Sequence, residues 1–287
     1  MVRRIAFLGP KGTFTEEALG HYISHEGWQV ELQEAHTIDE AIELTMQDKT
    51  DYAFVPIENS LGGTVLTTMD YLTDHRHIEI CGEIVMPIRH YVWGIEGANL
   101  IEIKDLYSHP QAIRQCKPFI QSHMAGAEIQ YTGSTAEGGS IVADAKDVHK
   151  AAVGGMALGQ TYGLTRLSDE AQENTYNLTR FVLVRHNANL ELALNEHSKG
   201  RKLSLQCELD GLRPGSLWEC LGIFAKRHIN LLKIESRPTK GRLGEYKFFF
   251  DLQIESNGDA VKEALAELET VATDIQLFGV YGTIIIE

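Results

Sequence analysis

A hydroxyl and a guanidinium stand directly before a short apolar run in the stretch Tyr176-Asn177-Leu178-Thr179-Arg180-Phe181-Val182-Leu183-Val184. The uncharged end of this stretch predicts a buried strand. Side chains alternate along a strand, so Thr179 and Arg180 reach one cleft only if the chain bends before the strand begins. The alternative is a plain strand edge with a solvated arginine, the common environment of this residue type.

Composition limits the class of protein. The chain has 287 residues, 43% hydrophobic and 23% charged, which predicts a soluble, globular protein with two domains, or with one domain and a smaller partner. No apolar run approaches the ~20 residues of a membrane span, and the run before Gly9-Pro10 is too short for a signal peptide. We therefore expect a cytoplasmic protein.

Charge and cysteine usage exclude further classes. The formal net charge of -14 disfavours binding to nucleic acid or to an anionic membrane, both of which need a basic face. A few local donors would have to hold any anionic substrate. The cysteines show neither paired nor metal-ligand spacing, so we expect reduced thiols and no metal site; they are Cys81, Cys116, Cys207 and Cys220.

Strands and helices alternate over the first part of the chain, which is the pattern of an α/β fold. The expected strands span residues 3–8, 30–32, 52–56, 78–86, 106–109, 128–131 and 151–154. The expected helices span residues 13–24, 37–47, 65–72, 110–122, 134–143 and 156–162. Capping boxes open three of these helices, in Thr13 with Glu16, Thr37 with Glu40 and Ser134 with Glu137.

Two polar segments lie between a strand and a helix, where α/β folds place ligands. Gly9-Pro10-Lys11-Gly12 leads into the helix at Thr13, whose free amides and dipole favour an anion. Ile57-Glu58-Asn59-Ser60-Leu61-Gly62-Gly63-Thr64 gathers an acid, an amide, hydroxyls and glycines. Plain turns and caps remain the alternative for both segments.

A further polar set follows the strand that ends near residue 109. Gln111 and Gln115 lie one helical turn apart and can face the same pocket as Ser108, with a solvated helix face as the alternative. We interpret His109 as a structural histidine, since no cysteine or carboxylate stands at triad spacing. Residues 165–176 are polar and aperiodic, which predicts a mobile loop or lid.

A polar linker over residues 187–200 precedes a second module. In this module we expect strands at 202–209, 229–234, 246–254 and 279–286 and helices at 216–228 and 260–270. The order βαββαβ predicts a ferredoxin-like fold. The module carries no nucleophile, metal cluster or phosphate loop, so we expect a role in regulation or assembly.

Several motifs, taken in order, resemble the prephenate dehydratase family over nearly the entire chain. They are Gly9-Pro10-Lys11-Gly12-Thr13-Phe14, Glu58-Asn59-Ser60, Ser108-His109-Pro110-Gln111 with Gln115-Cys116, Ser134-Thr135-Ala136 and Asn177-Leu178-Thr179-Arg180-Phe181. The second module resembles the ACT domain attached to those enzymes, through Arg213-Pro214-Gly215-Ser216-Leu217 and Ile234-Glu235-Ser236-Arg237-Pro238.

The resemblance implies two α/β lobes that face each other across a cleft, as in a periplasmic binding protein, and a ferredoxin-like ACT domain. It implies a catalytic domain at 1–186, with one lobe at about 1–80 and 160–185 and the other at about 81–159, and the ACT domain at 201–287. No helical chorismate mutase segment precedes Met1, so the chain resembles the monofunctional form.

The implied reaction converts prephenate to phenylpyruvate, water and carbon dioxide in phenylalanine biosynthesis, without metal or cofactor. The resemblance makes Thr179 the catalytic hydroxyl and Arg180 a carboxylate partner. It makes Asn59, Ser108 and Gln115 polar cleft residues, and Thr13, Phe14, Glu58, Ser60, Ser134, Thr135 and Phe181 substrate-binding residues.

For the ACT module the resemblance implies feedback control by phenylalanine, bound between two modules of a homodimer or homotetramer. The implied contacts are Gly215, Ser216 and Leu217 at a helix start and Glu235, Ser236 and Arg237 on the partner strand. The family usually has Ala and Val where this chain has Ser216 and Trp218, so the identity of the effector stays open.

Two other functions remain open at this point. The first is arogenate dehydratase, in which the substrate side chain carries an ammonium in place of the keto group of prephenate. The second is a non-catalytic sensor that uses the cleft only to bind an amino acid or an oxoacid. The intact stretch from Asn177 to Phe181 favours an enzyme.

Overall fold

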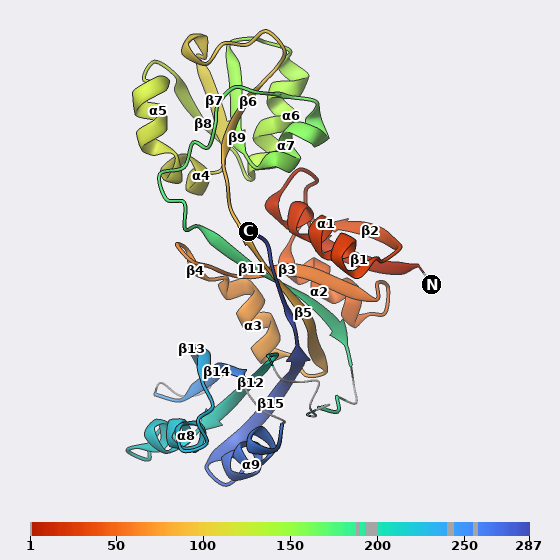
Figure 1. Cartoon of the computed structure of the whole chain (residues 1–287), viewed down its shortest axis with the longest axis vertical. Coiled ribbons are helices and arrows are strands. Elements are labelled where there is room, and N and C mark those ends of the chain that lie inside the picture. The colour runs from red at the N-terminus through yellow and green to blue at the C-terminus, as the bar shows by residue number, and fades with distance from the viewer. Residues whose placement is uncertain (1, 188–189, 193, 195–199, 240–243, 255–257) are drawn as a thin grey trace. The chain divides into compact units, whose positions relative to one another are not determined.

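The computed structural model describes residues 2–187, 190–192, 194, 200–239, 244–254 and 258–287, which form two compact units (Figure 1). The first unit holds the chain up to Thr68, Ile84–Phe181 and Ile285–Glu287, and the second holds Met69–Glu83 and Val182–Ile284. Most of the expected linker lies outside the described residues. The expected domain boundaries stay a prediction, since the units divide the chain at other positions.

A seven-stranded sheet has the order β16-β5-β11-β3-β1-β2, with β4 beside β3. Its strands are β1 (Arg3–Leu8), β2 (Val30–Ala35), β3 (Tyr52–Asn59), β4 (Gly63–Thr64), β5 (Ile78–Pro87), β11 (Leu178–His186) and β16 (Thr283–Ile285). β1 pairs in parallel with β2 and β3, as strands joined by helices do. In the core Phe54 stacks on Phe181, with ring centroids 5.7 Å apart.

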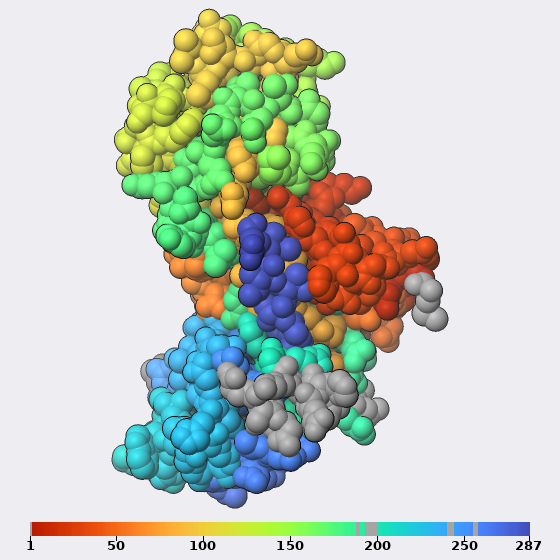
Figure 2. Space-filling model, in the orientation of Figure 1, coloured from red at the N-terminus to blue at the C-terminus, as the bar shows by residue number. Residues whose placement is uncertain are grey.

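The C-terminal end of the chain forms an edge of this sheet. β16 pairs with β5, and the amide of Ile286 donates to the carbonyl of Val85 at 2.9 Å. Figure 2 shows this end, in dark blue, at the molecular surface, where Ile285 is 70% exposed.

Helices α1 (Phe14–Glu26), α2 (Ile38–Met46) and α6 (Thr135–Ala145) begin as the capping boxes predict. In α1 the hydroxyl of Thr13 accepts from the amide of Glu16, and the carboxylate of Glu16 accepts from the amide of Gly12 at 2.6 Å. The same reciprocal pattern caps α2 and α6. Gly12 has a φ of +83°, a left-handed conformation that favours glycine.

A five-stranded sheet in the first unit has the order β10-β6-β9-β7-β8. Its strands are β6 (Tyr91–Gly94), β7 (Asp105–Ser108), β8 (Glu128–Tyr131), β9 (Lys150–Gly154) and β10 (Thr165–Arg166), and the 3-10 turn η1 (Leu100–Glu102) precedes β7. Alternate side chains pack to opposite sides, with Val92 and Val153 toward α4 (Pro110–Gln115) and α5 (Lys117–His123). Trp93 and Ala152 pack toward α6 and α7 (Met156–Tyr162). The two pairs of helices lie on opposite sides of this sheet (Figure 1). The predicted two-lobed α/β fold is confirmed.

One prediction of local structure in this part is wrong. The single helix expected over 110–122 is divided between α4 and α5, because Pro118 has no amide proton to continue α4. The aperiodic segment at 165–176 begins with the two residues of β10, which pair antiparallel with β6, and has no further strand or helix up to residue 176. Its role as a mobile loop or lid stays a prediction.

The second unit contains a four-stranded antiparallel sheet in the order β13-β14-β12-β15. Its strands are β12 (Lys202–Leu209), β13 (Leu231–Pro238), β14 (Tyr246–Gln253) and β15 (Ala272–Tyr281), with helices α8 (Ser216–Ala225) and α9 (Asp259–Leu268). Leu205, Phe224 and Phe250 are fully buried in the core between this sheet and the two helices. The predicted ferredoxin-like order is confirmed.

The prediction of one last strand at 279–286 is wrong. β15 already begins at Ala272, and the separate strand β16 follows it. Ile275 and Leu277 of β15 face the core, but Asp274 before them and Gln276 between them interrupt the apolar run from which a strand is predicted. Both polar side chains lie on the opposite face of the sheet, as strand alternation requires.

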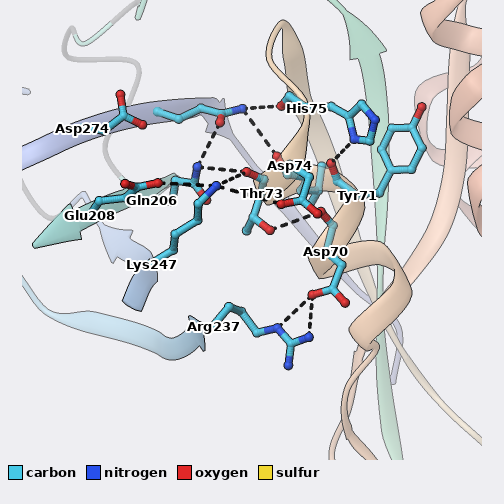
Figure 3. A network of polar contacts seen from close by, with 12 residues as sticks. Asp70, Tyr71, Thr73, Asp74, His75, Gln206, Glu208, Arg237, Lys247 and Asp274 are labelled. Carbon is cyan, nitrogen blue, oxygen red and sulfur yellow. Dashed lines mark hydrogen bonds and ion pairs between the residues drawn. The ribbon is translucent and has the colours of Figure 1, made fainter. Parts of the chain in front are cut away.

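That opposite face packs against residues 69–83, which include the end of helix α3 (Leu66–Asp74). The last carbonyls of a helix lack partners inside it. Here the carbonyl of Thr73 in the last turn accepts from Lys247 Nζ at 3.0 Å and from Gln206 Nε2 at 3.2 Å (Figure 3). The carbonyl of His75, directly after the helix, accepts from Gln276 Nε2 at 2.7 Å. The sheet therefore caps α3.

A charged contact lies beside this cap. Arg237 of β13 donates through Nε and Nη2 to Oδ1 of Asp70 on α3, at 2.9 and 2.6 Å (Figure 3). Arg237 thus lies on the face of the sheet opposite α8. Its neighbour on the strand, Ser236, stands opposite Phe248, which packs on the α8 side.

Two predictions from composition were also tested. No helix among the described residues is both long and apolar enough to cross a bilayer. All four cysteines are free thiols, and burial raises the pKa of Cys81 and of Cys116 to about 12. Neither sulfur is a ready nucleophile at neutral pH.

Candidate active site

A cavity of about 760 Å³ lies in the first unit and is lined from both of its lobes. This volume is typical of small-molecule sites. The lining comes from the starts of α1, α4 and α6, the turn after β3, and the connections before β6 and β11. Phe14, Val65, Ile88 and Phe181 give it apolar walls.

Most of the predicted site residues line this cavity. They are Thr13, Phe14, Asn59, Gln115, Ser134, Thr135, Thr179 and Phe181. Gln111 and His109 also line it, and His109 Nδ1 accepts from the amide of Gln111 as the N-cap of α4, in keeping with a structural histidine.

The other four predicted residues are placed elsewhere. Ser108 is fully buried and donates to the carbonyl of Val153 at 2.7 Å. Ser60 donates to the carbonyl of Tyr176 and accepts from the amide of Leu178, which holds the chain just before Thr179. Arg180 donates to Glu58 at 2.6 Å, and neither side chain is part of the lining.

Strand alternation explains the separation of Arg180 from Thr179. β11 already begins at Leu178, so no bend precedes the two residues. Thr179 and Phe181 face the cavity, and Arg180 faces the other side of the sheet. The role of Arg180 as a carboxylate partner stays a prediction.

The side chain of Asn59 is oriented by backbone amides. Its Oδ1 accepts from the amides of Leu61 at 3.1 Å and Gly62 at 2.7 Å. Its Nδ2 therefore points the other way, to Asn177 Oδ1 and to Thr179 Oγ1, both at 2.8 Å. This bond occupies one lone pair of the Thr179 oxygen. No acceptor for the Thr179 hydroxyl is found among the described residues, and Thr179 lines the cavity, so its proton is available for a hydrogen bond there.

The chain of amides continues to the second lobe. Asn177 Nδ2 donates to Gln115 Oε1 at 3.1 Å, and His90 Nε2 reaches the same oxygen at 2.9 Å. No hydrogen bond is found for Gln115 Nε2 among the described residues, and Gln115 lines the cavity. Gln115 and Thr179 thus present two neutral donors, linked through Asn59 and Asn177.

Two helix starts present further donors. The N–H groups of Phe14 and Thr15 in α1, and those of Thr135 and Ala136 in α6, have no partner in the described part of the chain. The helix dipole makes both starts favourable for anions. None of the described residues that line the cavity is a lysine or an arginine.

Sequence reasoning missed two members of the hydrogen-bonded chain that links the donors of the site, Asn177 and His90. Asn177 is 1% exposed and belongs to the quoted motif, so its place before the strand was a usable signal. His90 is 3% exposed and stands between two apolar strands. Its partner Gln115 is 25 residues away in sequence, and no local pattern predicts that contact.

Two matches with family models identify the chain. A prephenate dehydratase model matches residues 5–189, and an ACT domain model matches residues 213–270. The chain belongs to the prephenate dehydratase family. A prephenate dehydratase from Methanocaldococcus jannaschii is 34% identical over 281 residues, which cover 98% of each chain.

Two solved structures share the fold. The prephenate dehydratase from Arthrobacter aurescens in complex with L-Phe has a TM-score of 0.84 and 30% identity, over 97% of this chain and 90% of that one. GqqA, described as a novel type of quorum quenching acylase, has a TM-score of 0.85 over 98% of both chains at 24% identity, a likeness that shows the fold alone.

Burial of His90 predicts a pH dependence of stability. Burial lowers its pKa to about 4, against the opposing effect of the Gln115 hydrogen bond. In the unfolded chain this histidine takes up a proton near its ordinary pKa of about 6.5, whereas in the folded protein it stays neutral down to about pH 4. The free energy of unfolding is therefore not reduced by this group above about pH 6.5, and it falls by about 3 kcal/mol as the pH drops from 6.5 to 4. Urea unfolding from pH 7 to 4 should show this loss in the wild type and not in His90→Gln.

The variant is the necessary control, because other groups titrate in the same range. Burial raises the pKa of Glu17, which changes stability in the opposite direction as the pH rises. Only the difference between the free energies of unfolding of the wild type and His90→Gln isolates the contribution of the histidine. An identical pH dependence in both proteins would contradict a buried, neutral His90.

Proposed function

We propose that this chain is a prephenate dehydratase, which converts prephenate into phenylpyruvate, water and carbon dioxide in phenylalanine biosynthesis. The observation that carries this proposal is the Thr179 hydroxyl, oriented by Asn59 into a cavity of neutral donors. The bond from the ring to its carboxylate breaks and releases carbon dioxide, and its electron pair completes the aromatic ring as the opposite hydroxyl leaves. The departing oxygen takes one proton, supplied in the end by solvent, and becomes water. Aromatisation drives this step without a cofactor. A cytoplasmic location stays a prediction from the sequence.

The departing hydroxyl gains negative charge and needs donors that are already in place. Thr179 and Gln115 supply two hydrogen-bond donors, one for each lone pair of the departing hydroxyl oxygen when it lies between them. Asn59 and Asn177 fix both donors before substrate arrives, so no reorganisation accompanies bond cleavage. A threonine hydroxyl is a weak acid, so we assign Thr179 a hydrogen bond that strengthens in the transition state.

We assign the two carboxylates of prephenate to the helix starts of α1 and α6 instead of to Arg180. The free amides of Phe14, Thr15 and Thr135 line or adjoin the cavity, whereas Arg180 is paired with Glu58. Negative charge leaves the ring carboxylate during the reaction. A guanidinium at the ring carboxylate would stabilise the charged ground state more than the transition state and so slow the reaction. Neutral amides stabilise the ground state less and slow the reaction less.

The remaining predicted residues support this site from outside the cavity. Ser60 holds the chain before Thr179, and Glu58 with Arg180 joins β3 to β11 beside it. Ser108 ties β7 to β9 under the start of α4. We assign these residues structural roles in the catalytic domain.

Turnover of prephenate tests the proposed function directly. Wild-type protein should form phenylpyruvate, which is followed by its absorbance in alkali. The two carboxylates of the lining, Glu34 and Glu137, already accept from the backbone amides of Lys11 and Gly133, so we assign neither to the ammonium group of arogenate and expect prephenate to be the better substrate. Equal or faster turnover of arogenate would reassign the substrate, and no product from either would support a binding protein instead.

Replacing Thr179 by valine tests the catalytic hydroxyl. Valine keeps the shape and removes the donor, and loss of one preorganised donor should lower kcat by about 100- to 1,000-fold. Thr179→Ser, which keeps a hydroxyl, should retain much more activity. Near-normal turnover by the valine variant, with a melting temperature like that of the wild type, would refute this role.

We further propose that phenylalanine binds the ACT module and inhibits the enzyme. Gly215, Ser216 and Leu217 form the start of α8, and Ser236 lies on the same side of the sheet. The related structure from Arthrobacter aurescens was solved with L-Phe. β13 is an edge strand, so a second copy can pair beside it in a homodimer or homotetramer.

Titration of phenylalanine against activity tests this regulation. The initial rate with prephenate should fall as phenylalanine is added, because a ligand that prefers one arrangement of the protein shifts the population toward it. Tyrosine serves as the matched control ligand. A rate that stays unchanged at millimolar phenylalanine would remove the regulatory claim and leave the catalytic one intact.

A further inference from the structure

We propose that His90 is a positioning residue for the dehydration, which holds Gln115 so that the N–H groups of this glutamine point into the cavity. The inference rests on the proposed function and deepens it. His90 itself is 3% exposed and acts through Gln115 instead of through contact with the reacting atoms.

The direction of each hydrogen bond that leads to His90 is set by the backbone. The amides of Leu61 and Gly62 can only donate, so Asn59 must present its oxygen to them and its nitrogen to Asn177. Asn177 must then present its own nitrogen to Gln115. Gln115 is left with its oxygen on this side and its nitrogen on the cavity side.

His90 completes this arrangement at the second lobe. Its Nε2 lies 2.9 Å from Gln115 Oε1, so the ring must carry a proton on Nε2 to form the bond. Two donors, from His90 and Asn177, then converge on one oxygen and fix the plane of the Gln115 amide. Without His90, Asn177 alone would hold the amide, and the group could rotate about that single bond.

The imidazole ring is itself held firmly. The amide of His90 donates to Gln172 Oε1 at 2.7 Å, and its carbonyl accepts from the amide of Ala171 at 2.8 Å. The ring of Phe14 meets the imidazole edge to face, with centroids 5.1 Å apart and an interplanar angle of 85°. A side chain so constrained can position its neighbour within the tolerance that catalysis needs.

The second ring nitrogen shows why this residue is not there for packing. Nδ1 of His90 is buried and has no hydrogen-bond partner among the described residues. Burying an unpaired polar atom is unfavourable, and an apolar side chain of similar size would avoid it. The bond from Nε2 to Gln115 is therefore what the histidine contributes.

A matched pair of substitutions separates positioning from other roles. In His90→Gln the amide nitrogen lies about as far from the backbone as Nε2 of the histidine and can still donate to Gln115. In His90→Asn the amide nitrogen lies only as far out as Nδ1 and cannot. We expect kcat for prephenate to fall by about 30- to 100-fold in His90→Asn, with KM changed only a few-fold, since loss of positioning acts on the transition state. His90→Gln should stay within a few-fold of wild type.

Both variants replace the ring with a smaller polar side chain, so their melting temperatures should fall by similar amounts. Equal losses of kcat in the two variants would overturn the proposal and point to packing, or to Nδ1 acting as a base. Normal kcat in His90→Asn would overturn it as well. A wild type without turnover would refute the proposed function instead.

A readout that does not depend on activity tests the same inference. Nitrogen-15 chemical shifts of the imidazole of His90 in the wild-type protein at pH 7 should report a neutral ring protonated on Nε2. A ring protonated on Nδ1, or a charged ring, would contradict the hydrogen-bond directions and overturn the proposal. His90→Gln identifies the resonance, because only that signal disappears.

Discussion

A backbone amide can only donate, and this restriction on Leu61 and Gly62 orients the polar side chains of the site. Their approach to Asn59 depends on the turn after β3. A Cβ atom on Gly62 would lie 3.2 Å from Asn59 Oδ1, and Gly63 adopts a φ of +77°. The glycines that follow Asn59 therefore allow two amides to converge on one oxygen. From that point the directions of the hydrogen bonds to Thr179, Asn177 and Gln115 are determined in turn.

The charge of the site follows a similar logic. Glu16 and Glu137 accept from backbone amides next to the cavity, and the lining carries no lysine or arginine within the described residues. A dianion bound there meets helix starts and neutral donors. This suits a reaction in which charge moves from a carboxylate to a leaving oxygen, because donors placed for the final distribution of charge matter more than strong attraction for the initial one.

What could be predicted from the sequence was local. A capping box spans four residues, so Thr13, Thr37 and Ser134 identify helix starts directly. Strand alternation correctly places Thr179 and Arg180 on opposite faces once the strand is known to begin at Leu178. The fold class followed from the order of such elements.

What could not be predicted depends on contacts between distant residues. Asn177 lies 62 residues from Gln115 and 118 from Asn59, and nothing near it in sequence shows that it joins them. Ser108 is the last residue of strand β7 and belongs to a favourable motif, but its hydroxyl donates to the carbonyl of Val153 on the neighbouring strand β9. The split at Pro118 is different, because that signal was local and outweighed the helical pattern around it.

The C-terminal end of α3 also depends on contacts that are distant in sequence. The C-terminal carbonyls of this helix would be unsatisfied on their own, and Gln206, Lys247 and Gln276 of the sheet supply the donors. Residues 69–83 pack with the second unit because those donors are there, although the family model places them in the dehydratase part of the chain. The C-terminal part of α3, from Met69 on, therefore depends for its stability on side chains of this sheet.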